Sequence, residues 1–199
     1  GRSSSERQTN EGAPYQEWAA KKVIESFNKR AIDDPTSRCL PPGVPRVFSV
    51  GLFPIQFSHT ADQVVILYEY LNVFRVIPMG TQHPEDLEPS YLGDSVGHWE
   101  GNTLVIDVTG LNDSTWVDRA GNFHSDKLHV VERYTKTSND VMQYEATITD
   151  PDTFTRPWKI SMPLYRRQEK DAEVLEYDCG AYLLKQEWNK PGSRLFEQK

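Results

Sequence analysis

Residues 93–134 read GDSVGHWEGNTLVIDVTGLNDSTWVDRAGNFHSDKLHVVERY, and this stretch determines how the rest of the chain is interpreted. Three runs that lie in it or begin in it are rich in β-branched and aromatic residues, which favour strands: residues 96–100, 103–108 and 128–137. Gly101 and Asn102, between the first two runs, are typical of a tight hairpin turn. Residues 112–126 form a polar loop between the last two runs, and a polar loop held by strands is a frequent location for binding or catalysis.

Strand-like runs continue on both sides of this stretch. They cover residues 46–50, 55–59, 63–71, 73–78, 141–149, 158–165 and 174–177. Short connections between neighbouring runs favour antiparallel pairing, and about nine or ten short strands fit a closed sheet better than an open one. We therefore expect a mainly β fold, an antiparallel lipocalin-like barrel of about 8–10 strands with an N-terminal helix.

A chain of 199 residues most simply forms one domain. Residues 15–31 carry apolar side chains at steps of three and four, which predicts the amphipathic helix. Residues 1–13 are small and polar, so we expect a disordered tail there. The single β-barrel domain then covers residues 14–180, and residues 181–199 are a C-terminal extension.

The net charge of −7 argues against nucleic acid as a partner, because Lys and Arg supply most of that affinity. It also argues against anionic membrane surfaces. No apolar run approaches the roughly 18–20 residues of a spanning helix, so we expect no membrane insertion. No phosphate-loop or dinucleotide motif is present, and we expect no cofactor. The expected partner is a small-molecule ligand or substrate, and a homodimer stays open.

Two residues of the polar loop are the first candidates for acid–base catalysis. His124 is the candidate proton carrier, because an imidazole of unperturbed pKa about 6.5 suits both proton uptake and release. Asp118 precedes it across a glycine turn and could orient the ring. The alternative is an exposed histidine that contacts nothing.

The strand at residues 128–137 adds Glu132 and His129 as candidates for the second catalytic group. Alternation places Glu132 on the face of Val130 and Tyr134, and His129 on the opposite face. An inward Glu132 must be paired or protonated, so a structural pair with Arg or His on a neighbouring strand is an equal alternative.

Trp116 could give a ligand a flat apolar wall, or could fill the core beneath the loop. The other candidate ligand contacts are Ser125, His83, Tyr68, Tyr134 and Trp99. A metal held by His124, His129 and Glu132 was considered, but the spacing of the histidines matches no familiar ligand pattern, and we expect no metal.

The two cysteines, Cys39 and Cys179, lie too far apart for a Cys-x-x-Cys redox or zinc motif. Spacing alone allows either a disulfide that ties the N-terminal segment to the end of the core, or two buried thiols.

The chain resembles a family of uncharacterised bacterial proteins, found in acidobacterial and proteobacterial genomes and often made with a signal peptide. The resemblance rests on four motifs: CLPPGVPR at residues 39–46, VVILYEY at 64–70, the segment 95–134, and TITDPDTFTRPWKISMPL at 147–164. It implies an exported precursor. We therefore expect a periplasmic or secreted protein and favour the Cys39–Cys179 disulfide, while a cytoplasmic location stays open.

Our leading hypothesis is a cofactor-independent acid–base enzyme of the lyase or isomerase type. It would catalyse elimination, decarboxylation, isomerisation or cyclisation of a small apolar molecule inside the barrel, and an aromatic molecule is one option. The alternative is a periplasmic binding or carrier barrel without catalysis, and a third is an envelope-associated structural protein without a pocket. A cavity that receives His124 and Asp118 together with Glu132 or His129 would favour the enzyme, and a cavity lined only by aliphatic and aromatic groups would favour the carrier.

Overall fold

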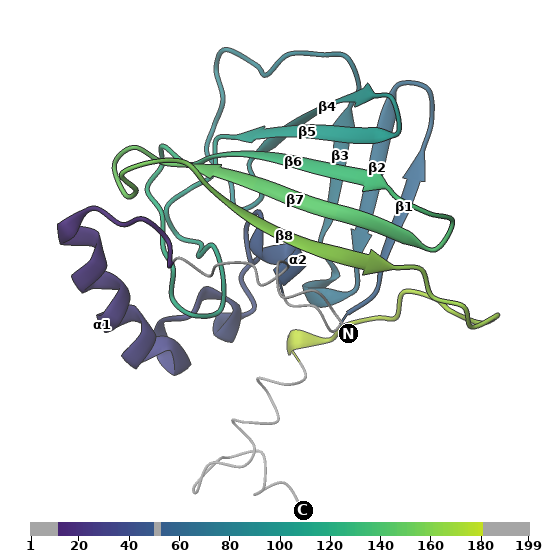
Figure 1. Cartoon of the computed structure of the whole chain (residues 1–199). Helices are drawn as coiled ribbons and strands as arrows, with labels where there is room; N and C mark the ends of the chain where they lie inside the picture. Colours follow the sequence, from purple (N-terminus) through teal and green to yellow (C-terminus); the bar gives the residue numbers. More distant parts are fainter. Residues whose placement is uncertain (1–11, 50–52, 181–199) are drawn as a thin grey trace, which may run out of the picture.

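The computed structural model describes residues 12–49 and 53–180, and the fold is mainly β (Figure 1). The helical elements are α1 (Glu17–Asp33), the 3-10 turn η2 (Pro35–Arg38), α2 (Arg46–Ser49) and the 3-10 turn η3 (Tyr70–Asn72). The strands are β1 (Ile55–His59), β2 (Gln63–Tyr68), β3 (Phe74–Pro78), β4 (Asp94–Glu100), β5 (Thr103–Thr109), β6 (His129–Lys136), β7 (Val141–Thr149) and β8 (Trp158–Tyr165). In this described part, no helix is long and apolar enough to cross a membrane.

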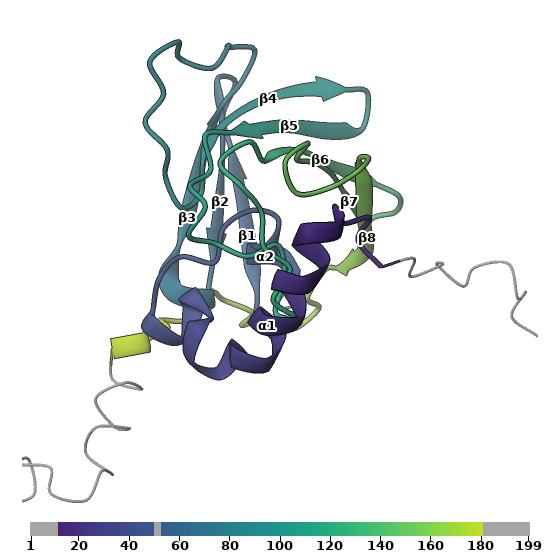
Figure 2. The same cartoon turned by 90° about the vertical axis from the view of Figure 1, so that its left-hand side faces the viewer.

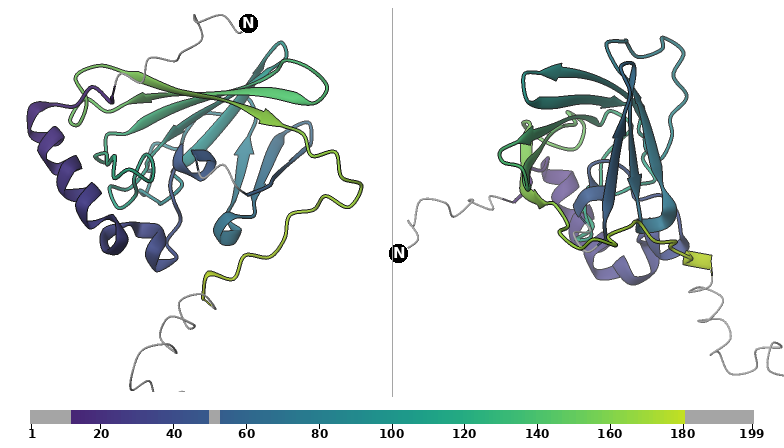
Figure 3. Two further views of the ribbon diagram at one scale, coloured as in Figure 1. Left: turned by 60° about the horizontal axis from the view of Figure 1, so that its bottom comes forward. Right: turned by 90° about the vertical axis from the view of Figure 1, so that its right-hand side faces the viewer.

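The strands form two antiparallel sheets, one of order β1-β2-β3 and one of order β4-β5-β6-β7-β8. The sheets meet at β3 and β4, where the Gly80 N–H donates to the Gly97 carbonyl at 2.8 Å. Gly97 permits this close approach, because a Cβ there would lie 2.7 Å from the Met79 sulfur. The other two edges, β1 and β8, face each other across the interior (Figure 3). The expected antiparallel, mainly β character is confirmed, whereas the strands form two sheets instead of one continuous ladder.

Side chains alternate between the two faces of most strands, as the sequence predicts. On β6, Val130, Glu132 and Tyr134 are buried while His129 and Arg133 lie on the outer face. The core between the sheets is built mainly from inward apolar residues of β2, β5, β6 and β7. Burying these side chains provides the main stabilisation of the fold.

The N-terminal helix is confirmed with slightly shifted bounds, Glu17–Asp33 in place of residues 15–31. It packs against the loop between β5 and β6 (Figure 2). A Cβ on Gly121 would lie 3.0 Å from the Phe27 backbone nitrogen, so the helix and the loop touch directly. Trp18 and Phe123 pack with ring centroids 5.8 Å apart.

Two predicted strands are wrong. Residues 46–50 were expected to be extended, but Arg46–Ser49 form the short helix α2, which lies between the sheets (Figure 1). A short apolar run has no period that separates strand from helix, and Pro45 loses no hydrogen bond at the start of a helical turn. Residues 174–177 are irregular: the Leu175 N–H donates to Glu69 at 2.9 Å and no ladder forms.

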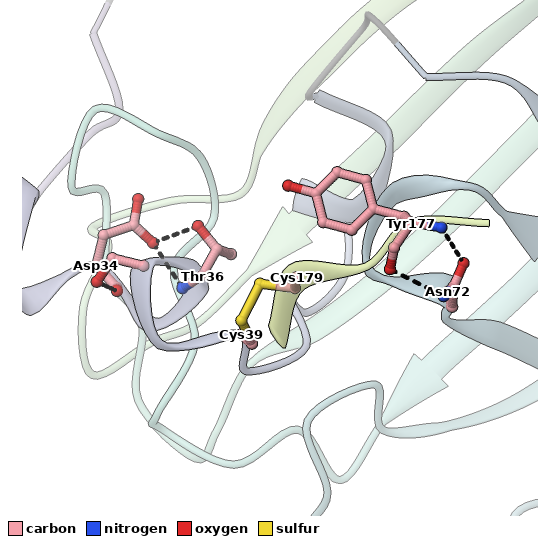
Figure 4. The surroundings of a disulfide bond; sticks show 7 residues. Asp34, Thr36, Cys39, Asn72, Tyr177 and Cys179 are labelled. Carbon is pink, nitrogen blue, oxygen red and sulfur yellow. Dashed lines mark hydrogen bonds between the residues drawn. A yellow bond between two sulfur atoms is a disulfide. The ribbon is translucent and has the colours of Figure 1, made fainter. Parts of the chain in front are cut away.

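Residues 166–180, which we call the C-terminal strap, leave β8 and pass across the opening between β8 and β1 (Figure 3). Asn72 fixes the strap through two hydrogen bonds of 2.9 Å with the Tyr177 backbone. Cys179 is bonded to Cys39, so the disulfide is confirmed and anchors the end of the strap beside η2 (Figure 4). The expected tail at residues 1–13 lies largely outside the described residues, and the extension at 181–199 lies entirely outside them.

The disulfide joins residues 140 positions apart, so reducing it should destabilise the protein by about 2–4 kcal/mol, because the unfolded chain gains conformational entropy. Thermal unfolding with and without reductant measures the effect. The Cys39→Ser/Cys179→Ser variant is the control and should show the lower melting temperature in both conditions. Equal melting temperatures for the oxidised and reduced wild type would contradict the bridge.

Candidate functional site

A cavity of about 1150 Å³ lies between the free edges of the two sheets. Its walls come from β1 on one side, from β7 and β8 on the other, and from the strap. Rings and methionines form much of the lining: Phe53, Phe57, Tyr70, Met142 and Met162. Phe53 and Tyr70 stack with centroids 5.0 Å apart, and Tyr177 of the strap packs edge-on against Phe53. Such walls suit an apolar or aromatic molecule, since methionine adapts its shape to what it contacts.

Charged side chains also line the cavity, with both signs equally represented. Three are cationic and three anionic: Lys136, Arg166, Arg167, Asp140, Glu169 and Glu173. Four of these six side chains belong to the strap, whereas Lys136 lies at the end of β6 and Asp140 in the β6–β7 turn. The balance gives the cavity no net attraction for an anion or a cation.

The inner end of the cavity is closed by Phe48 of α2 and Tyr68 of β2. Phe48 is 5% exposed and stacks on Tyr144 with ring centroids 4.6 Å apart. Its ring also packs edge-on against Tyr68, with centroids 5.2 Å apart, and in a tilted arrangement against Tyr134, at 5.3 Å. Three tyrosines therefore surround the ring of Phe48.

A fully buried ion pair lies beside these tyrosines and joins the two sheets. Arg75 on β3 contacts Glu132 on β6 through Nη1 and Oε2 at 2.6 Å. The Tyr134 and Tyr144 hydroxyls both donate to the other Glu132 oxygen, Oε1, at 2.9 Å. Arg75 also donates to Ser95 Oγ at 2.9 Å, on the neighbouring strand β4. The structural alternative that we weighed for Glu132, a pair with Arg, is the one observed.

The electrostatics of this cluster follow from burial and from the two charges. Burial lowers the pKa of Arg75, but the Glu132 carboxylate outweighs it, so the pKa lies above its ordinary value and Arg75 stays charged. Burial, together with the Glu132 charge, raises the pKa of the Tyr134 and Tyr144 hydroxyls. The phenols therefore remain protonated at neutral pH and act as donors to the carboxylate.

The sequence candidate His124 lies in a buried position of the β5–β6 loop, 3% exposed. Its Nδ1–H donates to the Ser125 carbonyl at 2.7 Å, so Nε2 accepts from the Thr115 hydroxyl, also at 2.7 Å. Burial lowers the pKa of His124, which keeps the ring neutral. Both ring nitrogens are occupied, and His124 does not line the cavity.

Asp118 does not reach His124, so the predicted pairing is wrong. Its Oδ1 accepts from the Ala120 N–H at 2.8 Å, and its Oδ2 accepts from the Asn122 amide at 2.5 Å. These bonds close the turn that ends at Gly121, which has a positive φ of 84°. A short loop that contains glycine can close in many backbone conformations. The local hydrogen bonds of Asp118 select the conformation observed here.

Ser125 connects the loop to the β7–β8 turn. Asp150 accepts from the Ser125 N–H at 2.7 Å and from its hydroxyl at 2.8 Å. Burial alone raises the pKa of Asp150, but the bonds from Ser125 and Thr153 outweigh it and lower the pKa. Ser125 is thereby held by Asp150, away from the lining of the cavity.

Of the aromatic candidates, only Tyr68 lines the cavity. Trp116 is 8% exposed and packs with Phe123 and Ala19 under α1, which is the core alternative. Tyr134 lies behind Phe48, and Trp99 is 56% exposed on β4.

His83 and His129 meet on the outer face of the larger sheet. His83 contacts Asp94 through Nδ1 at 2.5 Å and Asp107 through Nε2 at 2.9 Å. His129 Nε2 contacts the same Asp107, also at 2.9 Å. A neutral imidazole has only one N–H, so two carboxylate contacts require His83 to be protonated. Partial burial lowers the pKa of His83, but the hydrogen bonds to Asp94 and Asp107 outweigh it, so the pKa is raised.

The three residues considered for a metal do not converge. His124 is in the loop, His129 is on the outer face of β6, and Glu132 is inside. In the described ranges, 12–49 and 53–180, no group of three or more His, Cys, Asp or Glu side chains is arranged to hold a metal ion.

Sequence reasoning missed Arg75, Tyr144 and Phe48. Arg75 had a signal, because it alternates in phase with Ile77 on a strand whose inward face is apolar. Tyr144 likewise shares the inward face of β7 with Ala146 and Ile148. No comparable signal existed for Phe48, because residues 46–50 were expected to form a strand.

Comparisons with protein-family models, with curated proteins and with solved structures give no match to this chain. The function must therefore be argued from the geometry of the chain itself.

Replacing His124 with Ala should lower the free energy of unfolding by about 1–3 kcal/mol, because the Thr115 hydroxyl and the Ser125 carbonyl lose their buried partner. Urea unfolding measures this. His98→Ala, at a half-exposed position on β4, is the control and should change stability by less than about 0.5 kcal/mol. Unchanged stability in His124→Ala would count against the structural role and return His124 to the list of catalytic candidates.

His83 should make stability depend on pH. A raised folded-state pKa gives stabilisation that is fully present below the unfolded pKa of about 6.5 and is lost as pH rises through the folded value. The stability difference between wild type and His83→Gln should therefore be larger at about pH 6 than at about pH 9. Urea unfolding at both pH values tests this, with exposed His59→Gln as the control. A difference that does not vary with pH would mean that His83 is not protonated in the fold.

Proposed function

We propose that this protein binds a small, neutral, apolar molecule with aromatic character in the cavity between β1 and β8. The observation that carries the proposal is the composition of the walls, where aromatic, methionine and aliphatic side chains together outnumber the polar ones, while His124, Asp118, Glu132 and His129 all lie elsewhere. The absence of His124 and Asp118 from the lining supports a carrier over the enzyme expected from those residues, although His59 and six charged side chains also line the cavity. The balanced charges at the cavity favour a neutral ligand.

The proposed architecture for this function is a partly open, lipocalin-like barrel. Its closed side is the junction of β3 with β4, and its open side lies between β1 and β8. The strap covers the open side and supplies part of the cavity wall. Small barrels of about eight strands are wide enough to hold one small ligand.

We propose export to the periplasm or the outside of the cell. The Cys39–Cys179 bond supports this location, because disulfides persist in oxidising compartments. In such an aqueous compartment, a carrier would keep a poorly water-soluble apolar molecule dissolved.

The second candidate function is an acid–base enzyme, and the observation that favours it is the position of Tyr68. Its ring lines the cavity, and its hydroxyl lies 3.4 Å from Arg75 of the buried ion pair. Tyr68 would then be the proton-transfer group and the ion pair its support, in place of His124 and Asp118. Burial raises the pKa of Tyr68, which makes it an acid more readily than a base at neutral pH. Tyr68→Phe should abolish turnover under this second reading and leave a carrier's binding unchanged.

Titration with N-phenyl-1-naphthylamine, a neutral probe that fluoresces in apolar surroundings, tests the carrier. We expect saturable binding, and Met162→Glu should weaken it at least about tenfold because it places an unpaired carboxylate in the wall. Val76→Glu is the matched control, since Val76 is exposed on β3 outside the cavity. Its affinity should stay within about twofold of wild type. Absence of saturable binding, or equal losses in the two variants, would overturn the proposal.

A further inference from the structure

We propose that Phe48 determines which ligands the cavity accepts. Its ring closes the cavity toward the buried tyrosines and the Arg75–Glu132 pair, and so restricts the site to ligands whose inner end carries no hydrogen-bonding group. This inference rests on the proposed function, because it assigns a specificity to the same cavity.

The position of the ring is the first argument. Phe48 and Tyr68 line the inner end of the cavity, whereas Arg75, Glu132, Tyr134 and Tyr144 do not line it. Phe48 contacts both groups, since it faces the cavity and stacks on Tyr144 at 4.6 Å. The ring therefore stands between the aromatic inner end of the cavity and a polar cluster.

The hydrogen-bonding capacity of the cluster is the second argument. A phenol oxygen can donate one hydrogen and accept two, and the Tyr134 and Tyr144 hydroxyls each donate to Glu132. Tyr134 is also hydrogen-bonded with Tyr68, whereas the lone pairs of the Tyr144 oxygen remain as acceptors for a hydroxyl group that reached them. Arg75 Nε is also buried without a hydrogen-bond partner among the described residues. A ligand hydroxyl would find partners there, but Phe48 blocks its approach.

The scaffold fixes where Phe48 sits. The N–H groups of Val47 and Phe48 donate to the carbonyls of Gly43 and Pro45, at 2.9 and 3.0 Å, which holds the short helix in place. Gly43 in turn has a positive φ of 80°, and a Cβ on it would lie 2.6 Å from the Thr115 hydroxyl oxygen. Close contact with the β5–β6 loop therefore fixes the position of α2. Because Phe48 of α2 closes the cavity, the position of α2 also fixes how deep the cavity extends.

A purely structural role for Phe48 makes a different prediction. A core residue that only fills space would change stability on substitution and leave the relative preference between two ligands unchanged. The readout must therefore be a ratio of affinities for two ligands of nearly equal size. Naphthalene and 2-naphthol form such a pair, since they share the two fused rings and differ by one hydroxyl group.

The experiment compares the dissociation constants of naphthalene and 2-naphthol for wild type, Phe48→Ala and Phe48→Leu. In wild type the hydroxyl should bring no gain in affinity. In Phe48→Ala, the space left by the ring opens a path to the tyrosine oxygens, and the ratio should shift at least about tenfold toward 2-naphthol. In Phe48→Leu, a large apolar side chain still separates the cavity from the tyrosine oxygens, so this variant should keep the wild-type ratio. Adding Tyr144→Phe to Phe48→Ala removes one of the acceptors and should reverse much of the shift.

Circular dichroism establishes that each variant is folded before its affinities are compared. If Phe48→Ala does not fold, Phe48→Val, which removes less volume, should shift the ratio in the same direction. A folded small-residue variant with the wild-type ratio would overturn the role of Phe48 while leaving the binding function in place. Failure of wild type to bind either naphthalene derivative or the fluorescent probe would overturn the proposed function itself.

Discussion

The alignment of the two sheets depends on a buried contact between them, the ion pair of Arg75 on β3 with Glu132 on β6. Both charges are removed from water, so each must face the other, and a slip of either strand by one residue would turn its charge to the opposite face. We interpret the pair as a device that aligns the two sheets, because such pairs specify an arrangement more than they add stability. Ser95 and the hydroxyls of Tyr134 and Tyr144 add hydrogen bonds to the pair, while Arg75 Nε has no hydrogen-bond partner among the described residues.

This alignment creates the inner surface on which the rest of the interior is built. The hydroxyls of Tyr134 and Tyr144 turn toward Glu132, which leaves their ring faces toward Phe48. The aromatic rings thereby separate the polar cluster from the cavity, whose walls carry aromatic, aliphatic and charged side chains. A chain whose sequence offers many ionisable groups in one loop thus places its cavity elsewhere, between two edge strands. The loop between β5 and β6 instead packs against α1 and forms hydrogen bonds with the β7–β8 turn.

Much of the fold could be predicted from alternation, because inward and outward faces follow the period of two on strands such as β6. The inward carboxylate Glu132 and its need for a partner followed from the same pattern. Closure of the barrel could not be predicted, since it depends on how far β1 lies from β8. Pro163 was a usable signal, because proline lacks an N–H and is confined to edge strands, and β8 is an edge. The partners of His124 and Asp118 could not be predicted, because they depend on how a glycine-containing loop closes in space.

The strap has a consequence for the order in which the protein matures. Its residues follow all eight described strands in the chain, yet they form one wall of the cavity, and their far end is held by a bond to Cys39. Both sheets can pair before that wall exists. The strap can therefore add its wall after both sheets have formed, and the Cys39–Cys179 bond then holds the end of the strap in place.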